Sequence, residues 1–313
     1  MTAPLRLGTR RSALATTQSQ LVADALAATT GRAVELVPVT TYGDTSREAL
    51  AQIGGTGVFV NALRDALLSG VVDLAVHSLK DLPTAEPDGI VLAAVPPRED
   101  PRDVLVARDG LTLAELPPGS RVGTGSPRRA AQLRALGMDL DVVAVRGNVD
   151  TRLGLVADGR FDAVVLARAG LARLGRLDDV TEVIDPIQML PAPGQGALAV
   201  ECREPATPAD SSIAELLAGL DDASTRLAVT AERTLLATLE AGCSAPVGAY
   251  GEAAEGEHAP ELYLRAVVVA GDGSASLRLS ATGPLDEAQR IGRDLAAELL
   301  AEGAADLMWE RVT

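Results

Sequence analysis

A chain of 313 residues is long enough for two or three domains, and 47% hydrophobic residues allow a substantial core. The net charge of −15 argues against a general nucleic-acid or acidic-membrane surface, and 2% aromatic residues argue against base-stacking platforms. Two cysteines do not make a disulfide framework, and with only two histidines no zinc-type cluster is visible. The first residues lack a signal-peptide core and no run could span a bilayer, so we expect a soluble cytoplasmic protein.

The first third of the chain alternates between apolar strand-like runs and segments with helical spacing. We expect strands at residues 5–9, 34–41, 73–79, 90–97 and 103–108. Helices are expected at residues 11–30 and 58–70, each ended by a glycine. The polar, glycine-rich segment 41–57 between them is predicted to be a loop.

The alternation continues through the middle of the chain and changes character near residue 218. Further strands are expected at residues 120–125, 141–147, 161–170 and 195–203, with helices at 126–137, 148–159 and 223–242. Strands that alternate with helices of this length predict parallel sheets covered by helices on both faces. The last part predicts an antiparallel meander and a closing helix, at residues 245–252, 261–273, 274–283 and 285–304. No internal sequence repeat is evident.

Charge is distributed unevenly along the chain. Residues 121–176 contain ten arginines against five aspartates and no glutamate, a net charge of +5. Residues 204–310 contain six arginines against 19 acidic residues, a net charge of −13. A basic middle inside an acidic protein indicates a local anion site rather than a basic surface.

Three predicted strand-to-helix junctions carry arginines and polar residues. They are GTRRS with Arg10, Arg11 and Ser12, GTGSPRR with Thr124, Ser126, Arg128 and Arg129, and RGNVDTR with Arg146, Asn148 and Arg152. Helix N-termini offer unpaired N–H groups and a partial positive charge to an anion, and arginine forks match carboxylate or phosphate. Ser126 and Pro127 fit the cap and the first position of a helix.

Each junction also has a plainer explanation, because the same residues can cap helices and pair with the acidic exterior. The GTGSPR stretch resembles part of a dinucleotide glycine fingerprint, but the third glycine is missing and no P-loop pattern is present. Three such junctions in one α/β region favour an anionic ligand, and we predict a carboxylate-rich ligand rather than a nucleotide.

Lys80, in AVHSLKDLPT, is the only lysine of the chain. Lysine offers a compact ammonium where arginine offers a broad plane, so a site that needs a point charge would retain it. Asp81 follows directly, just beyond a strand end, where a carboxylate could stabilise a cation or move a proton. The alternatives are a solvated surface lysine and a turn residue before Pro83.

The two cysteines lie in different settings. Cys243, in LEAGCSAPVG, follows a helix in a glycine-flanked turn, where an exposed thiolate would be a good nucleophile. A small buried hydrophobe is the alternative for Cys243, and it is the better description of Cys202 in the apolar run ALAVECR.

The chain resembles the porphobilinogen deaminase family, also called hydroxymethylbilane synthase. The resemblance is carried by LGTRRSALA, DLAVHSLKDLPT, PREDPRDVLV, VGTGSPRRAAQL, VRGNVDTRL, LPAPGQGALAVECR and LEAGCSAPVG, in order across nearly the whole chain. It implies an α/β fold with two periplasmic-binding-protein-like (type II) domains and a smaller C-terminal α+β domain with a three-stranded antiparallel sheet. The implied boundaries are 1–96 with 197–217, 97–196, and 218–313.

The resemblance also implies the chemistry. Four porphobilinogen molecules would be joined head to tail with loss of ammonia, giving the linear tetrapyrrole hydroxymethylbilane. The implied cofactor is a dipyrromethane primer, joined by a thioether to Cys243, and Asp81 is the implied catalytic residue. The implied cofactor-binding residues are Ser12, Lys80, Thr124, Ser126, Arg128, Arg129 and Arg146, and the implied substrate-binding residues are Arg10, Arg152, Arg173 and Gln195. No metal and no Schiff base are implied.

One segment departs from the family pattern. Well-studied members often carry lysines of a mobile lid where this chain has Gln52 and Thr56, which puts any charge contact from that lid in doubt. The resemblance further implies a monomer that passes its product to uroporphyrinogen III synthase. Two other functions stay open on the residues alone: a non-catalytic carboxylate-binding protein, and an enzyme that forms a Schiff base on Lys80.

Overall fold

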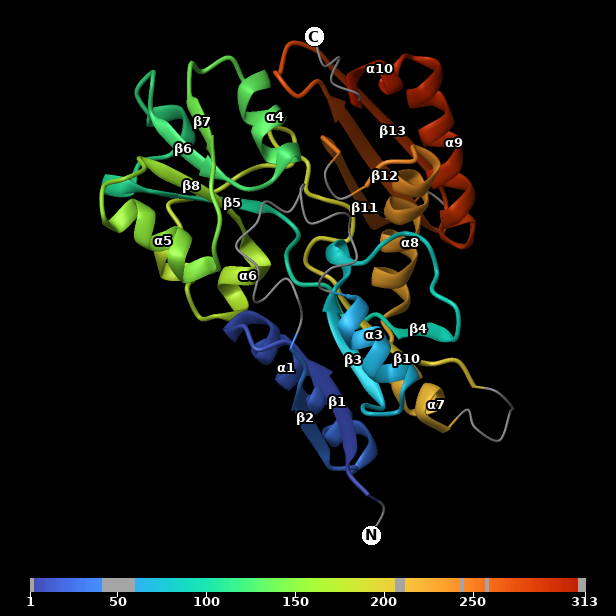
Figure 1. Ribbon diagram of the computed structural model, residues 1–313. Helices are drawn as coiled ribbons and strands as arrows, with labels where there is room; N and C mark the ends of the chain where they lie inside the picture. The colour runs from blue at the N-terminus through green and yellow to red at the C-terminus, as the bar shows by residue number, and fades with distance from the viewer. Residues whose placement is uncertain (1–2, 41–59, 206–211, 243–244, 257–258, 309–313) are drawn as a thin grey trace. The chain divides into compact units, whose positions relative to one another are not determined.

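The computed structural model describes residues 3–40, 60–205, 212–242, 245–256 and 259–308. The chain forms two compact units, the first made of Met1–Glu99 with Ala197–Arg226 and the second of Asp100–Gly196 with Leu227–Thr313. Figure 1 shows the labelled elements of both. The loop predicted at residues 41–57 lies outside the described residues.

The first unit contains a five-stranded sheet with the strand order β2-β1-β3-β10-β4. The strands are β1 (Leu5–Thr9), β2 (Val34–Pro38), β3 (Leu74–Ser78), β4 (Ile90–Ala94) and β10 (Leu198–Arg203). The helices are α1 (Ala13–Thr30), α3 (Asn61–Leu68) and α7 (Ser212–Ala218). Successive residues of β3 point to opposite faces, so Leu74 packs in the core that contains α1 while Ala75 packs against α3. Helices therefore cover both faces, as predicted.

The second unit repeats this plan in its own five-stranded sheet, with the order β7-β6-β8-β5-β9. The strands are β5 (Asp103–Ala107), β6 (Arg121–Thr124), β7 (Asp141–Ala144), β8 (Ala163–Ala167) and β9 (Glu182–Val183). The helices are α4 (Pro127–Ala135), α5 (Val149–Ala157) and α6 (Arg168–Arg173). The strand orders of the two sheets correspond position by position, although the sequence shows no internal repeat. The segment 161–170, predicted as one strand, is β8 followed by α6.

The prediction of parallel sheets is wrong for one strand in each. β10 runs antiparallel to β3 and β4, and β5 runs antiparallel to β8 and β9. A parallel neighbour needs a crossover of a dozen or more residues, usually helical. No helical crossover precedes β5, because β5 is the first strand after the chain passes from the first unit to the second near residue 100. β10 lies where the chain returns.

The C-terminal region of the second unit is an antiparallel sheet in the order β11-β12-β13. Its strands are β11 (Val247–Glu255), β12 (Pro260–Val269) and β13 (Ser276–Pro284), with α8 (Ala223–Thr238), α9 (Ala288–Ala301) and α10 (Ala304–Met308). The predicted meander and closing helix are confirmed. Side chains of β12 also pack on α4, through Val267, Val269 and Ala131. The boundary near residue 218 between separate second and third domains stays a prediction.

This architecture is the α/β fold expected from the sequence, with two five-stranded sheets of the same plan and an additional three-stranded antiparallel sheet. Among the described residues no helix is long and apolar enough to cross a bilayer. The same part of the chain contains no group of three or more side chains suited to hold a metal ion.

Candidate active site

The first junction lies between β1 and α1. Ser12 is the N-cap of α1, and its hydroxyl accepts a hydrogen bond from the Ala15 N–H at 3.4 Å. Gly31 ends the helix in the left-handed conformation, with φ of 68°, and its N–H donates to the Ala27 carbonyl. Arg10 is half-buried and Arg11 exposed just before the cap. The predicted capping is confirmed, and a ligand role for Arg10 and Ser12 stays a prediction.

Lys80 and Asp81 lie in a short 3₁₀ turn, Leu79–Asp81, directly after β3. The turn is held at its base, since Leu79 is fully buried and its N–H donates to the Ala197 carbonyl at 3.0 Å. One residue earlier, the Gln18 amide donates to the Ser78 hydroxyl at 2.9 Å. Asp81 is exposed and Lys80 half-buried. A carboxylate on a fixed turn is suited to interact with a ligand at a set position.

A buried ion cluster that the sequence analysis missed lies on the α3 side of β3. Glu201 of β10 accepts two hydrogen bonds from Arg64 of α3, at 2.6 and 3.1 Å, and His77 Nε2 lies 3.2 Å from the same carboxylate. Burial alone would raise the pKa of Glu201, but the contacts with His77 and Arg64 lower it to about 2. The clue in the sequence is a glutamate inside an apolar strand.

The second junction brings buried arginines to the start of α4. Ser126 is the N-cap, Pro127 occupies the first turn, and the Thr124 hydroxyl accepts the Ser126 N–H at 3.2 Å. Arg128 and Arg129 follow in the first turn, with only 3% and 5% of their surfaces exposed. The prediction placed arginines at a helix N-terminus, and their almost complete burial was not foreseen.

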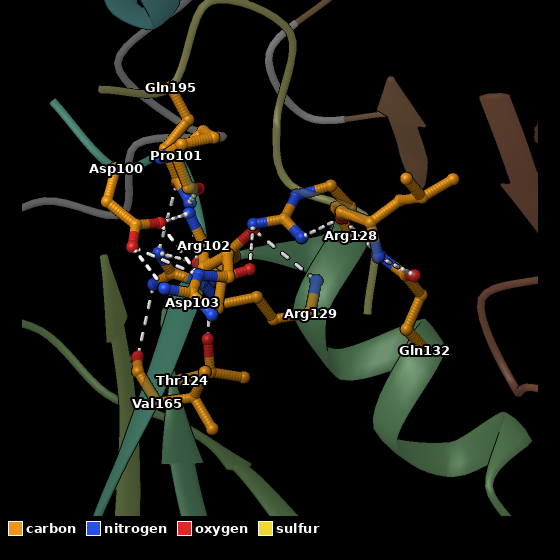
Figure 2. Close-up of polar contacts among 12 residues, drawn as sticks. Asp100, Pro101, Arg102, Asp103, Thr124, Arg128, Arg129, Gln132, Val165 and Gln195 are labelled. Atoms are coloured by element: carbon orange, nitrogen blue, oxygen red, sulfur yellow. Dashed lines mark hydrogen bonds and ion pairs between the residues drawn. The ribbon is translucent and has the colours of Figure 1, made fainter. Parts of the chain in front are cut away.

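Figure 2 shows that these two arginines converge on Asp103, the first residue of β5, which is 0% exposed. Arg128 Nη2 lies 2.8 Å from Asp103 Oδ2. Arg129 donates from Nε to Asp103 Oδ1 at 3.0 Å and from Nη1 to the Val165 carbonyl at 3.1 Å. The Arg128 Nη1 group donates to the Leu190 carbonyl. Sequence analysis missed Asp103, whose only signal was an acidic residue opening a fully buried strand.

The charges in this cluster do not cancel. Burial alone would raise the pKa of Asp103, but the charges of Arg128 and Arg129 lower it to about 2. Burial lowers the pKa of Arg128, and the charge of Arg129 lowers it further. One carboxylate between two guanidinium groups leaves a positive charge in a dry environment, where an anionic ligand would be favoured.

The third junction lies between β7 and α5, next to the second. Asn148 is the N-cap of α5, and its side chain accepts the Thr151 N–H at 2.9 Å. Arg152 donates from Nε to the Gly147 carbonyl at 3.0 Å. A Cβ on Gly125 would lie 2.7 Å from the Val145 carbonyl oxygen and 3.5 Å from Arg152 Nη2, so only glycine allows the two junctions to approach this closely. Burial, then the charge of Arg129, lowers the pKa of Arg152.

The remaining predicted residues differ in exposure. Arg146 is exposed, and Arg173 is half-buried with its Nη2 group donating to the Gly196 carbonyl at 2.6 Å. Gln195 is 0% exposed, and its amide nitrogen donates to the Pro101 carbonyl at 2.6 Å and to Asp103 at 2.8 Å. Its side chain therefore supports the buried cluster. Cys243 and the lid positions Gln52 and Thr56 lie outside the described residues.

The depressed pKa values of Asp103 and Glu201 predict acid destabilisation. The ordinary pKa values of these two groups, which apply in the unfolded state, are 3.8 for Asp103 and 4.5 for Glu201. Above these values both carboxylates stabilise the folded state, and this stabilisation is lost as the pH falls through the folded-state pKa of about 2. We expect each carboxylate to lose about 2–3 kcal/mol of stabilisation between about pH 5 and pH 2. Urea unfolding across this range should show the decline, and Glu201→Gln should remove its share. A wild-type stability independent of pH would contradict the prediction.

Taken unit by unit, the fold and these junctions define an α/β protein whose strand-to-helix junctions carry arginines and capping polar side chains. The chain belongs to the porphobilinogen deaminase family. Residues 5–211 match the model of the family's dipyrromethane cofactor-binding domain, and residues 226–301 match that of its C-terminal domain. The chain is therefore a transferase of tetrapyrrole and haem biosynthesis that condenses porphobilinogen to hydroxymethylbilane with a dipyrromethane cofactor. The predicted family and enzyme class are confirmed.

Curated relatives extend over almost the whole chain. It is 62% identical over 316 residues to porphobilinogen deaminase 1 of Streptomyces coelicolor and 64% identical over 321 residues to that of Streptomyces avermitilis, each covering 98% of both chains. It is 59% identical to porphobilinogen deaminase of Mycobacterium tuberculosis over 97% of this chain and 98% of that one. Among solved structures, a periplasmic substrate-binding protein from Coxiella burnetii matches 68% of this chain and 91% of its own, with a TM-score of 0.43 and 14% identity.

Proposed function

We propose that the dipyrromethane is joined to the chain by a thioether at Cys243. The observation that supports this assignment is the state of Cys202, the other cysteine of the sequence. Cys202 is 1% exposed within β10, and burial raises the pKa of its thiol. The thiolate is the nucleophilic form, so Cys202 is both inaccessible and unreactive. Cys243 is the remaining candidate.

The intact mass of the purified protein, followed by peptide mapping, tests this assignment. We expect a mass excess of two pyrrole units, carried by the peptide that contains Cys243 and absent from the peptide that contains Cys202. If the protein is purified without cofactor, incubation with porphobilinogen should add the same mass. An unmodified Cys243 after that incubation, or a modified Cys202, would contradict the proposal.

We propose further that the arginine-rich junctions bind carboxylates of the cofactor and of the growing chain. Each porphobilinogen carries an acetate and a propionate, so the ligand gathers carboxylates as it grows. The cofactor-binding residues are proposed to be Ser12, Lys80, Thr124, Ser126, Arg128, Arg129 and Arg146. The substrate-binding residues are proposed to be Arg10, Arg152, Arg173 and Gln195. When bound, the dipyrromethane supplies the pyrrole carbon from which the chain extends.

The buried cluster fits such a ligand. Arg128 and Arg129 share a single carboxylate, and the buried Nε of Arg128 has no hydrogen-bond partner within the described part of the chain. A buried donor without a partner and an uncompensated charge are both costly, and a ligand carboxylate would relieve both. Lys80, which lies in the other unit, would offer a compact ammonium to a ligand carboxylate.

Asp81 is the proposed catalytic residue. Its exposed carboxylate can accept hydrogen bonds from pyrrole N–H groups and stabilise the positive charge that develops as ammonia leaves. The buried Leu79 at the base of the turn fixes the backbone that carries Asp81. We also propose that the protein acts as a cytoplasmic monomer and that its product passes to uroporphyrinogen III synthase.

A further inference from the structure

We infer that Asp103 is a positioning residue for carboxylate binding, and that it acts through Arg128. Nothing in the family motifs singled out Asp103, whose carboxylate is 0% exposed and faces Arg128, Arg129 and Gln195. The inference rests on the proposed role of Arg128 in binding cofactor carboxylates. It concerns how that arginine is held and how much charge it presents.

The contacts of Asp103 fix its two arginines in different ways. Arg129 uses Nε, Nη1 and Nη2 on Asp103 and the Val165 carbonyl, so its plane cannot turn without breaking several bonds. Arg128 donates from Nη1 to the Leu190 carbonyl, and its Nη2 forms an ion pair with Asp103 at 2.8 Å. Its Nε remains without a hydrogen-bond partner among the described residues. Asp103 and the Leu190 carbonyl thus hold the two Nη groups of Arg128, and the Nε–H of Arg128 remains available to a ligand.

The charge of Asp103 matters as much as its geometry. With this carboxylate the arginine pair carries one net positive charge, which suits one ligand carboxylate. Without it two like charges would share a buried site, and Arg128 would turn toward solvent or toward other acceptors to escape the repulsion. A second carboxylate would neutralise the pair and remove the attraction for a ligand. Asp103 therefore sets both the orientation of Arg128 and the net charge of the arginine pair.

Gln195 completes the support. Its amide nitrogen donates to Asp103 Oδ1 at 2.8 Å and to the Pro101 carbonyl at 2.6 Å, while Arg129 Nη2 lies 3.4 Å from its amide oxygen. The carboxylate is therefore held from the segment before β10 as well as from α4. A change at Gln195 should loosen Asp103 without altering the charge of the cluster.

A double-mutant cycle on the full chain tests the inference. The readout is the rate at which porphobilinogen adds two pyrrole units to apo protein, followed by intact mass. We expect Asp103→Asn and Arg128→Gln each to slow this loading about tenfold or more. The double variant should be no slower than the slower single variant, because residues that act as one unit are not additive.

Asp73→Asn is the matched control. Asp73 also lies between two arginines, 2.7 Å from Arg6 and 3.7 Å from Arg203, but belongs to the other unit and has no proposed ligand role. It should load at the wild-type rate and, combined with Arg128→Gln, reproduce the rate of Arg128→Gln alone. A general effect of losing an ion pair would slow this control as well, and would overturn the inference.

The outcomes separate the inference from the function on which it rests. Normal loading by Arg128→Gln would remove Arg128 from cofactor binding. Slow loading by Arg128→Gln with normal loading by Asp103→Asn, or multiplicative losses in the double variant, would overturn the role of Asp103 alone. If Asp103→Asn does not fold, Gln195→Met decides. That variant should slow loading non-additively with Arg128→Gln, whereas loss of a separate substrate contact at Gln195 would multiply with the loss from Arg128→Gln. Multiplicative losses, or a wild-type rate for Gln195→Met, would overturn the inference.

Discussion

Replacing Asp81 by asparagine should lower kcat of the holoenzyme about 10²–10³-fold. Asparagine keeps the size and one oxygen acceptor of aspartate but loses the negative charge, and that charge is what would stabilise a developing cation. The side chain is exposed at the end of a buried turn, so folding should be unaffected. Steady-state kinetics on porphobilinogen, with the cofactor content checked by mass, measures the effect.

Asp88→Asn is the control for Asp81→Asn. Asp88 is an exposed aspartate in the same connection between β3 and β4, and it has no proposed role in the site. It should keep wild-type kcat, KM and cofactor content. A near-wild-type kcat for Asp81→Asn would remove Asp81 from the catalytic role, whereas a loss of cofactor from that variant would move its role from turnover to assembly.

The features that the sequence predicted well are those that short stretches determine. Ser12, Ser126 and Asn148 were placed at junctions between strands and helices, and each caps its helix with its own side chain. Gly31 stops α1 because its left-handed conformation needs no side chain. Apolar runs predicted the strands of both sheets except the two-residue strand β9, which the sequence analysis missed. In each case the signal and the structure that it specifies lie within a few residues of each other.

The direction of a strand is a different kind of property. β5 and β10 have the same apolar character as their parallel neighbours, and nothing local marks them as antiparallel. Their direction follows from the route of the chain, which leaves the first unit near residue 100 and returns near residue 197. The family resemblance implied that route, but periodicity alone led to the wrong prediction of parallel sheets.

The buried ion clusters were missed for a related reason. Asp103 meets arginines 25 and 26 positions later and Gln195 much farther along, and Glu201 meets Arg64 from 137 positions earlier. A charged residue inside an apolar strand shows only that a partner must exist, because an unpaired buried charge would be too costly. It does not show which of 27 arginines supplies the partner. The anion-binding character of the junctions could be predicted, and their internal support could not.

Replacing Cys243 by serine should abolish covalent loading and reduce turnover to background. The alcohol of serine is a much weaker nucleophile than a thiolate, and burial keeps Cys202 from taking over. Intact mass after incubation with porphobilinogen should equal that of the bare polypeptide. The variant should also melt below the wild-type holoenzyme, because the positive charge around Arg128 lacks its bound partner.

Lys80→Met separates this mechanism from Schiff-base chemistry in the same assay. If Lys80 supplies a point charge for carboxylates, the variant loads its cofactor more slowly but still gains the mass of two pyrrole units on Cys243. If Lys80 were the covalent site, borohydride would trap an adduct on it, and Lys80→Met would lose all activity while Cys243→Ser retained it. The two hypotheses rank the severity of Lys80→Met and Cys243→Ser in opposite order. The intact mass and the turnover rate of each variant therefore decide between them.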